Sequence, residues 1–565
     1  MWQVMCEEGY CWPQSMVVAS DSHSNMYGGI GCLGTPVVRT DAASIWATGK
    51  TWWQVPPVTK VTLKGSLRRG VSGKDVIITL CGRYNKDEVL NHAVEFSGEG
   101  IASLSIDERL TISNMTTEWG ALVGLFPTDE RTLNWLKQRI SIIQARNARL
   151  GLKFSERLTP KRLESLEQNL LKADTSANYA GELVLDLDKV VPHISGPNSV
   201  KKMEKVSEVS KRRIPVHKAY LVSCVNSRLE DIRQAAAEVS GKRVHSGVEL
   251  YLSAASSEVE SACREEGVWQ TLVDAGAKEL PPGCGPCIGL GAGLLRDGEV
   301  GISATNRNFK GRMGSRDADC YLASPAVVAA SAVAGYITLP EAVSAESFAQ
   351  DNQPATQPLN LESKREEVEK VKEVLLEEGF PERVEGQLVF CHQDNLNTDG
   401  IYPGKYTYRE DISPEQQAQV AMENYDPNFS TLVHSGDILV GGFNFGTGSS
   451  REQAATALKY KGIPVLFAGS FSETYKRNAI NNGFLVLETP QLSRDLKKLL
   501  GEESLTVKTT IHATVDFVVS KIHLKGAKEP LKSSYAFSPV GSIAQQLVIL
   551  GGLNNWVTQQ IRNKK

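Results

Sequence analysis

The stretch KAYLVSCVNS, residues 218–227, passes directly from a run of β-forming residues into a cysteine flanked by polar residues. Such an ending is typical of α/β proteins, in which the loops beyond the carboxyl ends of parallel strands carry the chemistry. Helical stretches separate it from comparable β-rich runs, namely SMVVASDS (15–22), KDVIITLCG (74–82), RVHSGVELYL (243–252), DILVGGFNFG (437–446) and IPVLFAGSF (463–471). The sequence therefore predicts an α/β protein built from several units.

The composition is that of a folded, enzyme-sized protein. At about 150 residues per domain, 565 residues correspond to three to four domains. The 62 Lys and Arg against 65 Asp and Glu leave a net charge of −3, which provides no overall basic field for nucleic acid or an anionic membrane. Ten cysteines between Cys6 and Cys391 are too sparse for a disulfide framework, so reduced thiols or metal ligands in a reducing compartment are expected.

A change of composition marks a boundary late in the chain. Residues 351–363, DNQPATQPLNLES, read as a connector, and residues 364–379, KREEVEKVKEVLLEEG, as a charged, solvated helix. We therefore expect a linker there and a separate α/β domain after it. The most apolar stretch, residues 323–339, is too short to cross a bilayer and is predicted to be a buried helix. The N-terminal residues show no secretory or transit pattern.

The strongest chemical signal is PPGCGPCIG, residues 281–289, together with Cys224. A Cys-x-x-Cys pair alone could be a redox pair or half of a zinc site. Three cysteines on loops after strands would leave one coordination position open, which suggests catalysis. The alternative is that Cys224 is an ordinary buried thiol and that the pair is a chance turn.

Four further segments concentrate polar groups among glycines. They are ASDSHSNMYGG (19–29), TISNMTTEWGA (111–121), SATNRNFKGRMGS (303–315) and FGTGSSREQ (445–453). Each alone is a weak signal, because a lone loop histidine or a pair of arginines is usually solvated. Together they indicate carboxylate binding by arginine and a serine hydroxyl activated by positive charge.

With its SCVNS, GCGPCIG, NRNFKGR and GSSRE motifs in the same order, the chain resembles the aconitase superfamily of iron-sulfur hydro-lyases along nearly its whole length. The resemblance implies a 4Fe–4S cluster held by Cys224, Cys284 and Cys287, with one iron free for the substrate. An iron without a protein ligand acts as a Lewis acid on a poor leaving group such as hydroxide. Asn114 and Asn306 match residues close to the cluster.

The resemblance also implies the remaining roles in the active site. Ser449 matches the base that removes a proton next to a carboxylate, and Asp21, His23 and Glu118 match an acid–histidine–carboxylate network. The positions that match substrate-carboxylate binders are Arg307, Arg312, Arg451, Ser450 and Lys405. Because Ser449 follows the linker and the cysteines precede it, we expect the last domain to swivel and close over the substrate.

The implied architecture is aconitase-like: three related α/β domains around the cluster, the first truncated, and a C-terminal swivel α/β domain. The expected boundaries are 1–56 for the remnant of the first domain, 57–175 for the second, 176–350 for the third with the cluster cysteines, 351–380 for the linker and 381–565 for the swivel domain. The family pattern continues far upstream of Asp21 and includes a catalytic Asp–His pair. Trp2 falls where the family has the histidine that pairs with the acid at Asp21.

The resemblance implies a monomeric lyase acting on a small tricarboxylate, without nucleic-acid or membrane partners. At residues 49–58, 81–100 and 397–411 the chain most resembles those family members that reversibly hydrate cis-homoaconitate to homoisocitrate in lysine biosynthesis through 2-aminoadipate, and the resemblance implies that activity. Aconitase or 3-isopropylmalate isomerase activity, or a truncated inactive homologue, are the alternatives. RNA binding without a cluster is disfavoured because no basic, aromatic-interleaved patch is present. A mitochondrial location is implied by the family alone.

Overall fold

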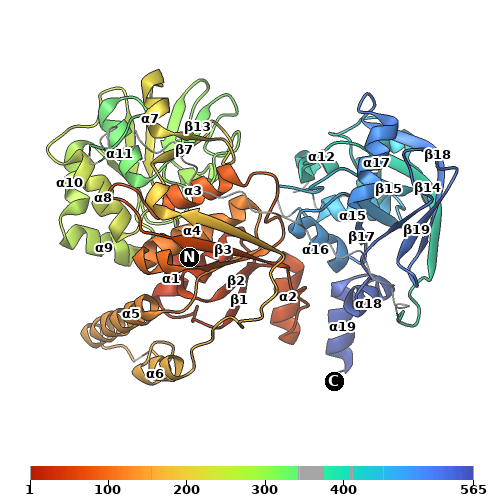
Figure 1. The fold of residues 1–565 in the computed structure, drawn as a ribbon, viewed down its shortest axis with the longest axis horizontal. Coiled ribbons are helices and arrows are strands. Elements are labelled where there is room, and N and C mark those ends of the chain that lie inside the picture. Colours follow the sequence, from red (N-terminus) through yellow and green to blue (C-terminus); the bar gives the residue numbers. More distant parts are fainter. Residues whose placement is uncertain are drawn as a thin grey trace. The chain divides into compact units, whose positions relative to one another are not determined.

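The computed structural model describes residues 2–153, 155–341, 343, 375–406, 409, 411–448 and 451–563. The chain forms two compact units (Figure 1). The first comprises Met1–Pro36 and Pro56–Ser363, and the second comprises Val37–Val55 and Lys364–Lys565. The predicted linker and its charged helix fall almost entirely outside the described residues.

The first unit begins with helix α1 (Trp2–Glu7) and a two-stranded parallel sheet of β1 (Met16–Ala19) and β2 (Leu33–Pro36). The 3-10 segment η1 (Ser22–Ile30) connects these strands. Its paired glycines allow close packing, since a Cβ on Gly28 would lie 1.7 Å from the carbonyl oxygen of Gly124. The segment is therefore held tightly against the core of the unit.

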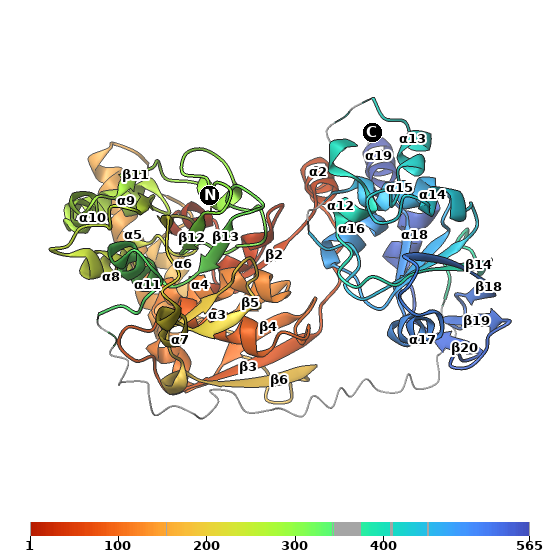
Figure 2. The same ribbon diagram turned by 90° about the horizontal axis from the view of Figure 1, so that it is seen from above.

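A four-stranded parallel sheet follows, in the order β5-β4-β3-β6 (Figure 2). Its strands are β3 (Val58–Lys64), β4 (Ala93–Ser97), β5 (Val123–Leu125) and β6 (Gly181–Asp186). Helices α3 (Gly73–Arg83) and α4 (Ile106–Trp119) pack with it in one core, to which alternate strand residues such as Val61 and Leu63 contribute.

Helix α3 corrects one prediction, because KDVIITLCG was expected to be β-rich. The side chain of Asp75 accepts hydrogen bonds from Ser72 N at 2.9 Å and from Ser72 Oγ at 3.1 Å, which starts a helix at this point. All nine residues of the run except Gly82 are buried. A short apolar run that is buried all round cannot be assigned to strand or helix by periodicity, and here tertiary burial overrides the preference of Val and Ile for strands.

The first unit also contains a seven-stranded sheet in the order β11-β10-β9-β12-β13-β7-β8. Its strands are β7 (His193–Ser195), β8 (Met203–Lys205), β9 (Lys218–Leu221), β10 (Glu249–Leu252), β11 (Lys278–Glu279), β12 (Val300–Ser303) and β13 (Asp319–Leu322). The neighbouring strands β11, β10, β9, β12 and β13 run parallel to one another. Their carboxyl ends therefore lie along one edge, from which the loops after β9, β11 and β12 emerge.

Helices cover this sheet, and one of them confirms a prediction. They are α8 (Leu229–Val239), α9 (Ser257–Glu265), α10 (Val268–Ala275) and α11 (Pro325–Ala334). Eight of the ten residues of α11 are buried, as predicted for the apolar stretch 323–339. The other helices of the unit are α5 (Glu130–Arg149), α6 (Pro160–Gln168) and α7 (Val206–Val209).

The second unit has a mixed seven-stranded sheet in the order β17-β16-β15-β14-β18-β19-β20. Its strands are β14 (Arg383–Cys391), β15 (Ile438–Gly441), β16 (Val465–Ala468), β17 (Leu485–Glu488), β18 (Thr506–Asp516), β19 (Lys521–Lys525) and β20 (Ser534–Ala536). Leu388 and Phe390 face one core and Val389 and Cys391 the other, as the alternation of a strand requires. Its later helices are α12 (Thr398–Ile401), α13 (Pro414–Gln419), α14 (Phe429–Leu432), α15 (Gln453–Tyr460), α16 (Glu473–Asn481), α17 (Pro490–Leu500), α18 (Ser542–Leu550) and α19 (Leu553–Asn563).

Residues 37–55, which we call the strap, belong to this second unit although they precede β3. The strap contains α2 (Arg39–Thr48), whose Asp41 is fully buried and forms an ion pair with Arg477 of α16. Arg477 also donates to Trp52 O at 2.6 Å, and Asn481 donates to Asp41 Oδ1 at 3.0 Å. This assignment differs from the expected boundaries, which grouped residues 37–55 with the N-terminal residues 1–56.

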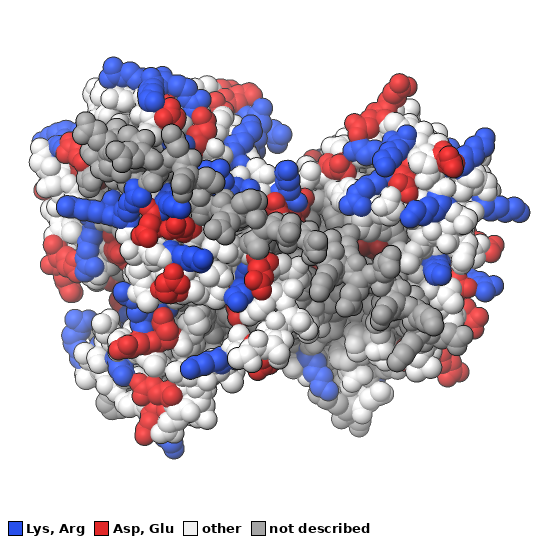
Figure 3. Space-filling model, viewed as in Figure 1, with Lys and Arg blue, Asp and Glu red and all other residues white. Residues whose placement is uncertain are grey.

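Charged side chains of both signs lie on the surface of the first unit. On the face of the first unit drawn in Figure 3, Lys and Arg side chains are interspersed with Asp and Glu, as on most solvated proteins. No helix among the described residues has the length and apolar character needed to cross a membrane.

Candidate active site

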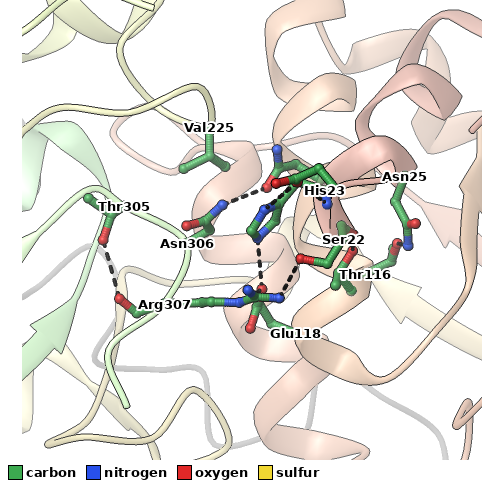
Figure 4. Close-up of polar contacts among 12 residues, drawn as sticks. Ser22, His23, Asn25, Thr116, Glu118, Val225, Thr305, Asn306 and Arg307 are labelled. Carbon is green, nitrogen blue, oxygen red and sulfur yellow. Dashed lines mark hydrogen bonds and ion pairs between the residues drawn. The ribbon is translucent and has the colours of Figure 1, made fainter. Parts of the chain in front are cut away.

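One polar network, centred on the buried His23, joins three elements of the first unit (Figure 4). His23, at the start of η1, lies between two carboxylates: its Nδ1 is 3.2 Å from Asp21 Oδ1, and its Nε2 is 3.0 Å from Glu118 Oε1 of α4. Arg307, on the loop after β12, donates from Nε to the same Glu118 oxygen at 2.7 Å. Both ring nitrogens of His23 are thus held, so the imidazole has a fixed orientation.

The groups around Asp21 and Glu118 lower the pKa values of these two carboxyl groups. Burial alone would raise the pKa of Glu118, but Arg307 and His23 hold that pKa below its ordinary value. Burial also opposes ionisation of Asp21, and the hydrogen bond with His23 likewise leaves its pKa lowered. Both carboxylates therefore stay ionised at neutral pH and place a negative charge beside each ring nitrogen of His23.

Arg307 has a second partner, Ser22, to whose Oγ its Nη2 donates at 2.9 Å. Ser22 is itself positioned by α4, because Thr117 Oγ1 donates to Ser22 O at 2.7 Å. The arginine predicted to bind substrate carboxylate is therefore preoriented by a carboxylate and a hydroxyl of the protein.

A second set of contacts surrounds Cys224, which follows β9. Asn114 Nδ2 of α4 donates to Cys224 Sγ at 3.8 Å, and Asn306 Nδ2 donates to Asn114 Oδ1 at 3.2 Å. The preceding residue, Ser223, has a φ of 112°, a backbone conformation that non-glycine residues rarely adopt and that occurs most often at functional sites. The chain turns sharply here and carries Cys224 beyond the end of the strand.

Cys284 and Cys287 lie on the loop after β11, around the short 3-10 segment η5 (Pro286–Ile288). Cys284 is exposed and Cys287 is buried. A hydrogen bond between the two thiols lowers the pKa of Cys284 to about 6 and raises that of Cys287. Arg312 holds this loop, because its Nε donates to Cys287 O at 2.8 Å. The pKa of Arg312 itself is lowered by burial and by the neighbouring Arg307.

The three cysteines can be compared with what a 4Fe–4S cluster requires of its ligands. In the described part of the chain, no three His, Cys, Asp or Glu side chains converge where a single metal ion could be held. A 4Fe–4S cluster makes a different demand, because each thiolate binds its own iron and the sulfurs stand apart. Burial, with a smaller contribution from the nearby Cys284, raises the pKa of Cys224 to about 11. An easily ionised Cys284 with two neighbouring thiols and an amide donor at Cys224 fits such a cluster.

Lys74, which the sequence analysis did not single out, supports the loop that carries Asn306 and Arg307. Its side chain is fully buried at the start of α3, and Nζ donates to Thr305 O and, at 3.3 Å, to Ala304 O. Burial lowers the pKa of Lys74 to about 7. The sequence contains a signal for this role of Lys74. A lysine in the first turn of a buried helix opposes the helix dipole and needs hydrogen-bond acceptors outside the helix.

The predicted residues of the second unit are only partly described. Ser449 and Ser450 lie outside the described residues. Arg451 forms an ion pair with Asp399 at 3.0 Å and donates to Tyr402 O. Lys405 is exposed and pairs with Glu423 at 2.7 Å. The structure therefore brings together Asp21, His23, Glu118 and Arg307, and separately Asn114, Asn306 and Cys224, within the first unit.

The cysteines to which the sequence analysis assigned no role are buried. These are Cys6, Cys11, Cys32, Cys81, Cys263, Cys320 and Cys391. In the core of the protein a thiol behaves as a small apolar side chain, so these residues are accounted for by packing.

Comparison with known proteins gives consistent matches. Residues 1–335 match the aconitase family (aconitate hydratase), and residues 359–492 match the aconitase C-terminal domain. The protein named "Homoaconitase, mitochondrial" from Mycosarcoma maydis is 51% identical over 99% of this chain and 81% of its own length. Proteins of the same name are 50% identical in Debaryomyces hansenii, over 99% of this chain and 81% of their length, and 52% identical in Yarrowia lipolytica, over 99% and 82%.

Solved structures also match the chain. One of them is 3-isopropylmalate dehydratase from Methanocaldococcus jannaschii, which is 28% identical and covers 32% of this chain and 98% of its own. Its TM-score of 0.27 is too low to inform the fold.

Proposed function

The chain belongs to the aconitase family, and on that premise we propose that it acts as a homoaconitase, a hydro-lyase that reversibly hydrates cis-homoaconitate to homoisocitrate. Relatives that bear the name homoaconitase are 50–52% identical over 99% of the chain, which supports this substrate. The reaction belongs to lysine biosynthesis through 2-aminoadipate. The printed names of these relatives also support a mitochondrial location.

We assign Cys224, Cys284 and Cys287 as the thiolates that hold a 4Fe–4S cluster. When bound, the cluster supplies a Lewis acid for the hydroxyl group that leaves or adds. Asn114 contributes an amide hydrogen bond to the Cys224 sulfur, at 3.8 Å, which tunes the ligand. Asn306 holds the Asn114 amide in the orientation that this contact needs.

The acid role goes to a histidine that two carboxylates hold in a fixed orientation. His23, fixed between Asp21 and Glu118, holds the proton that joins the leaving hydroxyl, and Glu118 stabilises the protonated imidazole. Ser449, which lies outside the described residues, is assigned as the base at the substrate carbon. The carboxylate binders are Arg307, Arg312, Arg451, Ser450 and Lys405, of which the arginines offer a bidentate fork and Lys405 only a point charge.

One observation carries the proposal: the same two elements supply both networks. Helix α4 provides Asn114 to the cysteine side and Glu118 to the histidine side, and residues four apart lie on one face of a helix. The loop after β12 provides the adjacent residues Asn306 and Arg307 to the same two sides. This shared support of the two networks favours the proposal, because hydration next to a Lewis acid needs acid–base groups close to the thiolate ligands.

The test is a comparison of substrates. The chain is reconstituted anaerobically with iron and sulfide, and kcat/KM is measured for cis-homoaconitate, cis-aconitate and isopropylmaleate. We expect cis-homoaconitate to be preferred by about 10-fold or more, since one methylene in a pocket is worth about 1–3 kcal/mol. A preference for cis-aconitate or isopropylmaleate would contradict the substrate assignment, and no hydration of any of the three by cluster-loaded protein would contradict the reaction.

A further inference from the structure

The second unit contains a cavity of about 790 Å³ to which the proposed reaction assigns no role. Its lining comes from that unit alone: the end of the strap (Lys50–Gln54), Lys476 and Ile480 of α16, β17 (Leu485–Glu488), α18 with the residues just before it, and Leu553 and Trp556 of α19. This volume lies within the usual range for sites that bind small molecules. The cavity is therefore large enough to enclose a ligand with several rings or a branched chain.

Its walls are mostly apolar and aromatic. Trp52, Trp53 and Trp556 line it together with aliphatic side chains such as Leu487 and Leu547. Trp52 is fixed in place, because its Nε1 donates to Asn481 Oδ1 at 2.7 Å and the guanidinium of Arg477 lies 4.3 Å from its ring centroid. The polar atom of this indole is thus already satisfied, and the ring serves as a rigid apolar wall for a flat body.

The charges on the lining are few and unequal. Lys476 and Glu488 face each other, with Nζ 3.8 Å from Oε1, and their charges offset one another. Lys50 is exposed, and its ammonium has no acidic partner within the described ranges. One positive charge therefore remains uncompensated on the lining of an apolar cavity.

We infer that this cavity binds a small apolar monoanion, an aromatic or branched aliphatic body that carries a single carboxylate. The indole rings and aliphatic residues take the body, and Lys50 takes the carboxylate. A tricarboxylate does not match this lining, because its further charges would be desolvated against apolar walls without a partner. The inference is independent of the proposed hydration reaction.

A series of three indoles that differ in charge tests the inference. Indole-3-acetate, indole and tryptamine share one ring system and are anionic, neutral and cationic, respectively, at pH 7. Their dissociation constants are measured with the full chain by isothermal titration calorimetry and by saturation-transfer NMR. We expect indole-3-acetate to bind at least 10-fold more tightly than tryptamine, with indole in between.

Reversal of one charge locates the site. Lys50→Glu is expected to weaken indole-3-acetate at least 10-fold and to strengthen tryptamine, whereas Lys528→Glu, at an exposed lysine of the same unit outside the lining, leaves both unchanged. Circular dichroism and Tm confirm that both variants fold. Equal binding of all three compounds, no binding of any, or an unchanged preference in Lys50→Glu would each overturn the inference.

Discussion

Glu118 is the residue at which the charges of the candidate active site meet. One carboxylate oxygen lies within hydrogen-bonding distance of both His23 Nε2 and Arg307 Nε, and the side chain is only 11% exposed. A carboxylate in this position orients the imidazole and neutralises a largely buried guanidinium at the same time. The negative charge of Glu118, more than the shape of its side chain, is therefore expected to hold His23 and Arg307 in place.

Glu118→Gln keeps the shape and removes the charge. We expect kcat for hydration to fall by about 100-fold or more, in line with the loss of general acid–base assistance, while KM changes less. The measurement is steady-state kinetics of reconstituted protein. The matched control is Glu130→Gln, at an exposed position of α5. A variant with nearly normal kcat would contradict the role assigned to Glu118.

Lys74 leads to a prediction about pH. Its pKa in the folded chain is about 7, below the ordinary value of 10.5, because burial disfavours the charged amine. Between these pH values the unfolded chain keeps a proton that the folded chain has released, so this residue makes stability rise with pH. A neutral amine still has two N–H groups for Ala304 O and Thr305 O.

Lys74→Met removes this dependence. The free energy of unfolding of the wild type minus that of the variant is expected to increase between pH 7 and pH 10, by up to about 1.4 kcal/mol per pH unit. Urea unfolding at a series of pH values measures the difference, with Lys86→Met at an exposed position as the control. A difference that stays flat or falls over this interval would show that Lys74 is not held as the structure indicates.

At the scale of elements, sequence reasoning succeeded where a motif and its strand lie close together in the chain. Cys224 was expected just beyond a strand, and it follows β9 directly. Reasoning from pattern failed for α3, where nearly complete burial removes the periodicity on which the distinction between strand and helix depends. The contacts of Glu118 could not be predicted without the family resemblance, because its partners His23 and Arg307 are 95 and 189 residues away in the sequence.

The strap is the element whose role depends most on a single ion pair. Asp41 and Arg477 are 0% and 4% exposed, and breaking a buried pair leaves an uncompensated charge. We expect Asp41→Asn to destabilise the second unit by about 3–5 kcal/mol. Differential scanning calorimetry of the full chain measures the change in its unfolding transition.

The control for this prediction is Asp411→Asn. Asp411 pairs with Arg409 at 2.8 Å, but both side chains are exposed, and solvent screens such a pair so that its removal changes stability little. Equal effects of the two substitutions would mean that the strap is not anchored through Asp41.

For the whole molecule, the α/β class and the family were accessible from the sequence because local motifs carry them. The assignment of the strap to the second unit was not, since it depends on contacts between positions more than 400 residues apart. The proposed function depends above all on three cysteines of the first unit, which are proposed to hold the cluster on which hydration depends.

The most direct test measures iron, sulfide and hydration rate in the same reconstituted samples. We expect each reconstituted chain to hold about four iron and four sulfide ions. The rate of cis-homoaconitate hydration should be proportional to the bound iron. Cys284→Ala is expected to lose both the cluster and the activity, whereas Cys263→Ala, at a buried cysteine outside the site, retains both. Full activity in Cys284→Ala, or hydration that does not depend on iron, would contradict the central claim.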